Sequence, residues 1–301
     1  MDTIKTPRVA LIINKRNRAH YVMLAPVVIY LLTFVYWPII RGAVMSFQDF
    51  TFINDSAFIG ITHYRAMFRD RDFWNALGNS LTFAFFNVIL GVFLSCLLAI
   101  MLNEIAGKFF RNFTQTIIYI PNLFSWVVVG SAFLMLLSPS TGSFNYLLVF
   151  FGIEPIYFFG KANYSKFLII FINQWKVCGS GVIIYMAAIV GISHEQFEAA
   201  QIDGANRLQK ILHVTAPNLS NAVKVMTMLN IMGMLMLFDP IYVLQNPITL
   251  RANDVLTTYI YRTGINKLNL GYGAAVSMAI CVLTLAITLT AKRLIRYGLE
   301  D

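Results

Sequence analysis

The sequence has 301 residues, of which 58% are hydrophobic and only 12% are charged, and its mean hydropathy is +0.67. An ordinary soluble domain carries about 25% charged residues, so this composition excludes a soluble globular protein and predicts an integral membrane protein. The formal net charge of +9 does not indicate nucleic-acid binding, because the basic residues are scattered along the edges of apolar segments and do not gather on one face.

A helix needs about 20 mostly apolar residues to cross a hydrocarbon core of about 30 Å. The candidate segments show no period-2 alternation and are too long for barrel strands, so helices are predicted. No internal repeat or separate soluble domain is visible, and we expect an all-α protein with one six-helix transmembrane domain over residues 21–297. In chain order, the predicted helices cover about residues 21–45, 79–103, 113–137, 166–192, 217–240 and 271–291.

Basic residues beside the first and last spans predict the orientation of the chain, because Lys and Arg accumulate on the cytoplasmic side. Six crossings place the tails 1–20 and 298–301 on the same side, and we expect both termini in the cytoplasm. Residues 1–20 contain no apolar segment of the kind that a cleavable signal peptide requires. The basic residues that carry this prediction are Lys5, Arg8, Lys15, Arg16, Arg18, Lys292, Arg293 and Arg296.

The sequence contains no pattern typical of a metal site or of catalysis. Cys96, Cys178 and Cys281 fall in three different predicted spans, and the four histidines lie in separate segments without metal-ligand spacing. No GxxxxGK[ST] phosphate loop occurs, so the chain itself is not expected to bind ATP. We therefore predict no catalytic residue, no metal and no cofactor in this chain.

A charged, amphipathic segment, "EAAQIDGANRLQKILHVTAP" at residues 198–217, lies between the fourth and fifth predicted spans. Ser193 and Gln196 match a capping box, which predicts a helix over residues 194–213. Gly204 interrupts it at a cost of about 1 kcal/mol relative to alanine, which indicates a turn between two short helices or a close backbone contact. Three interpretations stay open: a helix lying on lipid, a connector packed on its own bundle, and a helix that docks on a cytoplasmic partner.

The segment resembles the "EAA" signature of permease subunits in binding-protein-dependent ABC importers, which usually reads EAAxxxG, nine residues, IxLP. Val214 and Ala216 depart from the usual Ile and Leu but stay apolar. The resemblance implies a cytoplasmic coupling helix that docks on an ATPase subunit and transmits the closure of the ATPase dimer. The residues to which it assigns this coupling are Glu198, Ala199, Ala200, Asp203, Gly204, Arg207, Leu208 and Pro217.

The remainder of the chain is similar to sugar-type permeases of the maltose-permease superfamily, through "FIGITHYRAMF" at 58–68, "YIPNLFSWVVVGSAFLMLLSPSTGSFNYLL" at 119–148 and "DVLTTYIYRTGI" at 254–265. The last two segments resemble the branch that serves complex oligosaccharides and polysaccharide fragments. The resemblance implies a type I ABC importer permease fold in a bacterial cytoplasmic membrane. It also implies a second homologous permease subunit, two ATPase subunits that bind ATP and Mg, and an extracytoplasmic solute-binding protein.

Polar residues at membrane depth are costly, and they mark a substrate pathway or a packed polar contact. Lys176 is the clearest case, because it lies near the middle of the fourth predicted span. It could bond helix carbonyls, pair with an acid such as Asp239, or line a wet cavity that binds passing sugar. Pro121 should kink the third helix and free carbonyl groups there. The candidate pathway residues are Asn87, Asn122, Ser125, Trp126, Asn173, Gln174, Trp175, Lys176, Asn230 and Asp239.

These observations favour a non-enzymatic permease subunit of an ABC importer that moves an oligosaccharide or a sugar-acid oligomer inward by alternating access. An ABC permease for another small polar solute is an alternative. A stand-alone secondary transporter is disfavoured because such proteins usually contain internal repeats. A membrane-embedded enzyme is disfavoured because the spans contain no clustered His, paired Asp/Glu or Ser/His arrangement. The sequence does not identify the sugar.

Overall fold

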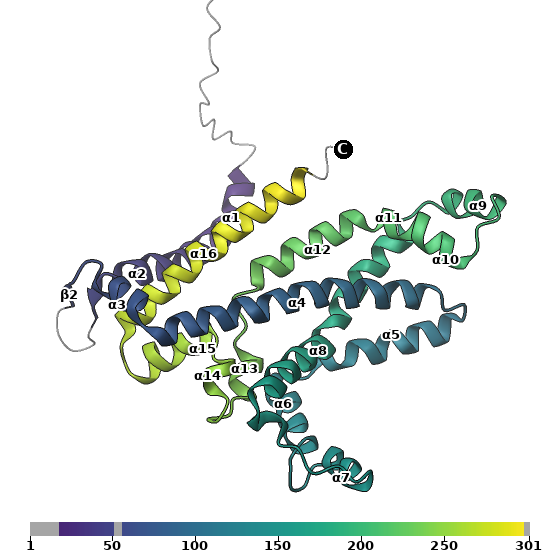
Figure 1. Cartoon of the computed structure of the whole chain (residues 1–301). Helices are drawn as coiled ribbons and strands as arrows, with labels where there is room; N and C mark the ends of the chain where they lie inside the picture. The colour runs from purple at the N-terminus through teal and green to yellow at the C-terminus, as the bar shows by residue number, and fades with distance from the viewer. Residues whose placement is uncertain (1–17, 51–55, 298–301) are drawn as a thin grey trace, which may run out of the picture.

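The computed structural model describes residues 18–50 and 56–297, so most of the predicted N-terminal tail and the C-terminal end lie outside the described residues. The described chain is mostly helical, and the strands in its described part, β1 and β2, form one short antiparallel hairpin. Figure 1 shows the helices in chain order. The longer elements are α1 (Arg18–Leu31), η2 (Leu32–Tyr36), α2 (Trp37–Met45), α4 (Arg71–Asn103), α5 (Lys108–Leu123), α6 (Trp126–Leu136), α8 (Ala162–Val190), α9 (His194–Ile202), α12 (Ser220–Gly233) and α16 (Leu270–Tyr297).

In the described part of the chain, four helices are long and apolar enough to cross a membrane. They are His20–Met45, which combines α1, η2 and α2, together with α4, α8 and α16, and they cover the predicted first, second, fourth and sixth spans. Helix α4 starts at Arg71, before the predicted residue 79, because Asp70 caps it: the backbone N–H of Asp72 donates to Asp70 Oδ1 at 2.8 Å.

The predicted third span is not one helix, because α5 and α6 meet at an angle of 98°. The chain leaves the helix at Phe124 and Ser125, beyond Pro121, where the sequence predicted the kink. Ser125 starts α6, since its Oγ accepts the backbone N–H of Val128 at 3.4 Å. If this bent pair counts as one membrane span, the described chain contains five segments that are long and apolar enough to cross a membrane.

The predicted fifth span, 217–240, differs in the structure at both ends. Helical backbone runs almost without a break from Arg207 into α12, so Pro217 does not begin a new helix but lies within this run. Helix α12 ends at Gly233, and residues 234–238 are not helical. The side chain of Thr257 donates to the free carbonyl of Leu237 at 2.6 Å, so a contact from α15 (Leu256–Ile260) supports the unwound segment.

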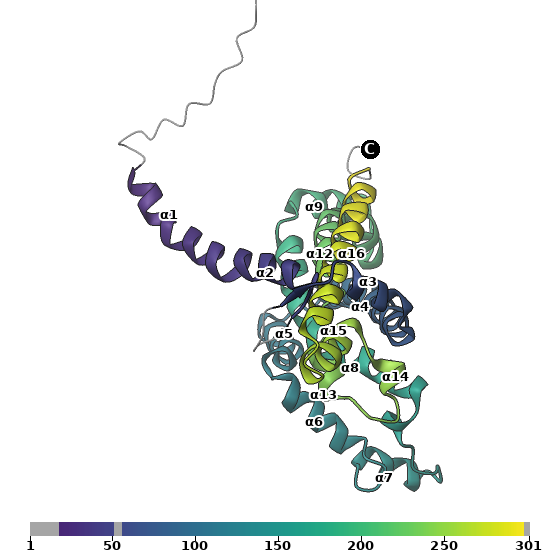
Figure 2. The ribbon, with the colours of Figure 1, turned by 90° about the vertical axis from the view of Figure 1, so that its left-hand side faces the viewer.

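The first helix stands away from the rest of the molecule, as Figure 2 shows. None of its apolar window is buried in this chain, whereas 56% of the window of α8 is buried. Its last turn meets α16, where a Cβ on Gly42 would lie 3.7 Å from Met278 Cε. The helix therefore joins the body only near its C-terminal end.

Helix α8 lies at the centre of the body (Figure 1). Its most extensive contact is with α4. Apolar clusters fill the contacts around these helices at three levels. One joins Phe83, Ile169 and Ile172 to Ile241 and Leu244 of the segment after α12. The second, at the other end of α4, includes Ala99, Leu102, Val182, Tyr185 and Leu219, and the third packs Met67 and Phe73 against Tyr259, Tyr272 and Val276.

The short elements gather at two opposite ends of the body. Helices α9 and α10 (Arg207–Lys210), the turn from α4 to α5 and the C-terminal end of α16 lie toward one end. The other end holds the hairpin, α7 and the helices between α12 and α16 (Figures 1 and 2). This second group comprises β1 (Gln48–Asp49), β2 (Ala57–Phe58), α3 (Thr62–Arg69), α7 (Ser143–Phe150), α13 (Asp239–Val243), α14 (Leu250–Asn253), α15 and η5 (Tyr261–Asn266).

Candidate functional site

The segment between α8 and α12 forms two short helices joined by a sharp turn. Helix α9 ends at Ile202, and Gly204 follows with φ +78°, a left-handed conformation that favours glycine. The N–H of Ala205 donates to the carbonyl of Ala200 at 2.9 Å, and the N–H of Gly204 donates to that of Gln201 at 3.1 Å. This is a Schellman motif, so Gly204 marks a turn and the helix predicted over 194–213 is divided there.

The starts of the two helices differ from the predicted capping. Ser193 Oγ accepts the N–H of Glu195 at 3.3 Å, but Gln196 binds the side chain of Asn218 at 2.8 Å and does not complete a capping box. Instead, Asn206 and Gln209 form a reciprocal capping box at the start of α10.

The two helices expose apolar side chains. Ile202 is 86% exposed and Leu208 is 64% exposed, although they flank a turn of charged and polar residues. Phe197 and Ala200 of α9 are only partly exposed, and Ile202 was not among the residues singled out from the sequence. The other predicted coupling residues around the turn, Glu198, Ala199, Asp203, Gly204, Arg207 and Pro217, are also exposed.

A second group of predicted residues meets between α4 and α8, near the middle of both helices. Asn87 Oδ1 accepts hydrogen bonds from Asn173 Nδ2 at 2.9 Å and from Gln174 Nε2 at 2.8 Å. Asn173 and Gln174 are buried, and Gln174 Oε1 has no hydrogen-bond partner among the described residues. A Cβ on Gly91 would lie 3.4 Å from Gln174 Oε1 and 3.6 Å from Asn230 Oδ1, so Asn230 borders the same group.

Lys176 closes the corner between α5 and α6. Its Nζ donates to the carbonyl of Asn122 at 3.2 Å and lies 5.3 Å from the centre of the Trp126 ring. Asn122 is two residues before the break, so Lys176 compensates a carbonyl that the break would leave unsatisfied. The sequence left open a bond to a helix carbonyl, an ion pair with Asp239 and a wet cavity, and the structure contains the bond to a carbonyl. No ion pair joins Lys176 to Asp239 in the described chain.

Replacing Lys176 with methionine should therefore destabilise the corner between α5 and α6. A hydrogen bond from a charged group contributes about 1.5–3 kcal/mol, and methionine keeps the apolar stem without the donor. We expect a lower thermal unfolding midpoint for the purified transporter, with recovery in Lys176→Arg. Lys267→Met removes an exposed lysine at the end that contains α13–α15 and should leave the midpoint unchanged. An unchanged midpoint in Lys176→Met would contradict this role.

The remaining predicted pathway residues, Ser125, Trp175 and Asp239, do not join either group. Ser125 caps α6, and Asn230, which borders the first group, donates to the carbonyl of Met226 in its own helix at 2.7 Å. Trp175 is 43% exposed and packs edge-on against Phe133. Asp239 is exposed at the start of α13.

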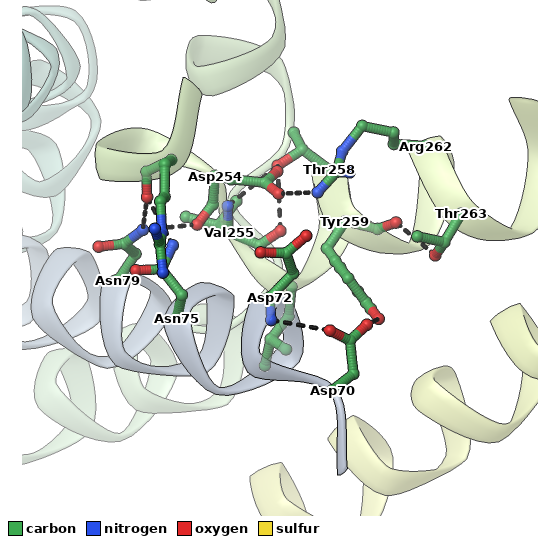
Figure 3. Close-up of polar contacts among 12 residues, drawn as sticks. Asp70, Asp72, Asn75, Asn79, Asp254, Val255, Thr258, Tyr259, Arg262 and Thr263 are labelled. Atoms are coloured by element: carbon green, nitrogen blue, oxygen red, sulfur yellow. Dashed lines mark hydrogen bonds and ion pairs between the residues drawn. The ribbon is translucent and has the colours of Figure 1, made fainter. Parts of the chain in front are cut away.

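A polar network that was not predicted from the sequence lies at the opposite end from α9 and α10 (Figure 1) and is drawn in Figure 3. The carboxylate of Asp254 is buried and accepts from Arg262 at 2.6 Å and from Thr258 at 2.7 Å. The carbonyl of Asp254 accepts from Asn79 Nδ2 of α4 at 2.9 Å, and Asn79 Oδ1 accepts from Lys166 Nζ of α8 at 2.9 Å. The network thus fastens the segment 250–263 to both central helices.

Tyr259 extends this network toward α16. Its hydroxyl donates to Asp70 Oδ2 at 2.5 Å and lies 2.6 Å from the hydroxyl of Tyr272. Burial, together with the hydrogen bonds to Asp70 and Tyr272, raises the pKa of Tyr259, so it stays protonated and can donate. Within the described residues, no group of three His, Cys, Asp or Glu side chains gathers as a metal site would require.

Comparison with known proteins places this architecture in a family. Residues 91–296, more than half of the chain, match the model of the binding-protein-dependent transport system inner membrane component family. The polygalacturonan/rhamnogalacturonan transport system permease protein YteP of Bacillus subtilis is 35% identical, over 91% of this chain and 86% of that protein.

Two solved structures have the same fold over nearly the whole chain. One is a bacterial ABC transporter involved in the import of the acidic polysaccharide alginate, and the other is the alginate transporter in complex with an alginate pentasaccharide-bound periplasmic protein. Each matches with 33% identity and a TM-score of 0.88, over 94% of this chain and 96% of the other. The chain therefore belongs to the family of inner membrane components of binding-protein-dependent transport systems, the permease subunits of ABC transporters.

Proposed function

We propose that the protein is the permease subunit of an ATP-driven importer that takes up an oligosaccharide from an extracytoplasmic binding protein. The observation that carries the proposal is the match, over 94% of the chain, to a chain of a transporter crystallised with a pentasaccharide-loaded periplasmic protein. The similarity to a polygalacturonan/rhamnogalacturonan permease supports the same class of substrate. Both relatives act on polymers that contain sugar acids, so acidic oligosaccharides are the first substrates to test.

The exposed turn of α9 and α10 supports coupling to a separate ATPase subunit. Ile202 and Leu208 offer apolar area, and the charged residues around Gly204 can set the register of a docked partner. A single exposed apolar side chain is ordinary on a protein surface, but two on one structured turn offer an apolar contact surface to a partner subunit. In this proposal α9, α10 and both termini are cytoplasmic, and the end that contains β1–β2 and α13–α15 receives the binding protein.

The bilayer arrangement follows from the same proposal. The bent pair α5–α6 and the helical run from Arg207 to Gly233 would complete six membrane segments. A second homologous permease would cover the exposed helix His20–Met45 and complete the pathway, and two ATPase subunits would supply ATP hydrolysis. ATP and Mg would bind to those subunits and not to this chain.

Transport by a reconstituted complex tests the proposed function. The chain is co-expressed with the permease, ATPase and binding protein encoded beside it, and the complex is placed in proteoliposomes containing ATP. We expect ATP-dependent uptake of a labelled trigalacturonate or another oligosaccharide that the binding protein retains. Uptake by the permease alone without ATPase subunits, or uptake only of amino acids or ions by the full complex, would overturn the proposal.

A further inference from the structure

A polar groove of about 440 Å³ follows the seam between α5 and α8. Asn112, Gln115, Thr116 and Tyr119 line one side, and Ile183 of α8 lines the other. The four α5 residues are spaced at i, i+3, i+4 and i+7, so they form one continuous face of the helix. We call this face, together with Ile183, the α5 lane.

The α5 lane is polar where an unpartnered membrane helix would be apolar. Among the described residues, the side chains of Asn112, Gln115 and Tyr119 have no hydrogen-bond partner, and Thr116 donates only to the carbonyl of Asn112, at 2.8 Å. Tyr119 is 11 residues into α5, about 17 Å along the axis. A polar group at the depth of Tyr119 faces lipid only at a large cost, so the inner part of the lane is better suited to a polar occupant than to lipid.

Other faces of the same helix are suited to lipid. Ile117 is 52% exposed, Ile120 is 41% exposed and Leu123 is 68% exposed. Two faces of opposite character are what a helix between hydrocarbon and a polar space would have. The contrast also gives an internal reference: Ile117 follows Thr116 directly but points about 100° away around the helix.

Close packing holds the groove in place. A Cβ on Gly179 of α8 would lie 2.5 Å from the carbonyl oxygen of Ile118, so the backbones of α5 and α8 touch there and the groove follows a rigid seam. Ile183 and Lys176 are seven residues apart and lie on the same face of α8. The lane therefore leads to the corner where Lys176 binds Asn122 beside Trp126.

We propose that the α5 lane is the section of the translocation route between this corner and the end of the body that contains α9, and that it binds the hydroxyl groups of an oligosaccharide. The inference rests on the proposed function and assigns the route to residues outside the polar group of Asn87, Asn173 and Gln174. Amide and hydroxyl groups can exchange hydrogen bonds with successive sugar hydroxyls, and the Tyr119 ring can stack on a pyranose face. The lane contains no charged side chain, so it would bind an acidic oligosaccharide through its hydroxyl groups and not through ion pairs.

Cysteine accessibility in the assembled transporter tests the lane. Cys96, Cys178 and Cys281 are replaced with alanine, and Thr116→Cys and Ile117→Cys are made in that background. Inside-out membrane vesicles carrying the complex are treated with a charged, membrane-impermeant methanethiosulfonate. A thiol in lipid has a raised pKa and little thiolate, so we expect Thr116→Cys to react at least about tenfold faster than Ile117→Cys.

The sugar dependence completes the test. Loaded binding protein and ATP should slow the modification of Thr116→Cys. After treatment with the reagent, Thr116→Cys should lose sugar uptake, whereas Ile117→Cys should keep it. Equal slow reaction at both positions would show a lipid-facing lane. Efficient cross-linking of Thr116→Cys to the other permease, through a cysteine introduced there and an added copper–phenanthroline oxidant, would show a subunit contact. Either result overturns the inference. So would fast modification that turnover does not slow in a complex that takes up the sugar. Failure of the unmodified complex to take up any oligosaccharide would overturn the proposed function instead.

Discussion

Replacing Gly204 with valine is expected to reduce transport-coupled ATP hydrolysis about tenfold or more while the complex still assembles. Gly204 adopts φ +78°, and a side chain in this left-handed region costs about 1–2 kcal/mol, roughly the energy of a tenfold change in an equilibrium. No atom lies within 4 Å of the position of an added Cβ, so the backbone and not a clash within the chain is responsible. The Schellman bonds from Gly204 and Ala205 to α9 should open, and the turn that presents Ile202 and Leu208 should lose its shape.

The chain contains a closely matched control for this experiment. Gly152 has φ +77°, also has no atom within 4 Å of an added Cβ, and follows α7 in the same motif: its N–H donates to Val149 and that of Ile153 donates to Leu148, both at 2.9 Å. Gly152→Val should carry a similar folding cost, at the opposite end of the molecule, and retain coupling. Gly204→Asn should recover most activity, because asparagine tolerates the left-handed region. Equal losses in both valine variants, or none in Gly204→Val, would contradict the docking role of this turn.

Replacing Asp254 with asparagine should be strongly destabilising, because it leaves the guanidinium of Arg262 without its carboxylate at the centre of the network in Figure 3. Removing one partner of a buried ion pair costs about 3–5 kcal/mol, and solvent at Arg262, which is 30% exposed, should reduce this to about 2–3 kcal/mol. The measurement is the thermal unfolding midpoint of the purified transporter, which should fall by several degrees.

Two further variants separate the ion pair from other effects at this position. Adding Arg262→Met to Asp254→Asn removes the unpaired cation and should recover part of the lost stability. Asp239→Asn neutralises an exposed carboxylate and should leave the midpoint unchanged. If Asp254→Asn matches Asp239→Asn, the network does not fasten the segment 250–263 as described.

The length of the apolar segments predicted the four long helices, His20–Met45, α4, α8 and α16, because a long apolar run in a membrane protein has few alternatives to a helix. The breaks were harder to predict. Pro121 correctly pointed to the third span, but the chain turns at Phe124 and Ser125, where Ser125 can cap the next helix. At 234–238 the sequence is a good helix former, and the helix ends where Thr257 offers a hydrogen bond to Leu237 from a distant segment.

The candidate sites differ in the same way: features formed by neighbouring residues were predictable, and contacts between residues far apart in the sequence were not. The turn at Gly204 is encoded within a few residues, so the cost of a glycine inside a helix indicated it, with a close backbone contact as the alternative. The contact of Lys176 with Asn122 joins residues 54 positions apart, and the bond from Asn79 to Asp254 joins residues 175 positions apart. Asp254 and Arg262 lie outside the predicted spans, where charged residues are ordinary, so nothing in the local pattern marked them as a buried pair.

The isolated position of the first helix affects how the stability of this subunit can be measured. With no part of its apolar window buried by the rest of the chain, His20–Met45 contributes little side-chain packing to the fold beyond its last turn against α16. In the proposed assembly, its tilt would be set by lipid and neighbouring subunits. Cooperative melting of the purified polypeptide would report mainly on the other helices. Energetic terms that depend on this segment would become measurable only in the proposed assembly with a second permease.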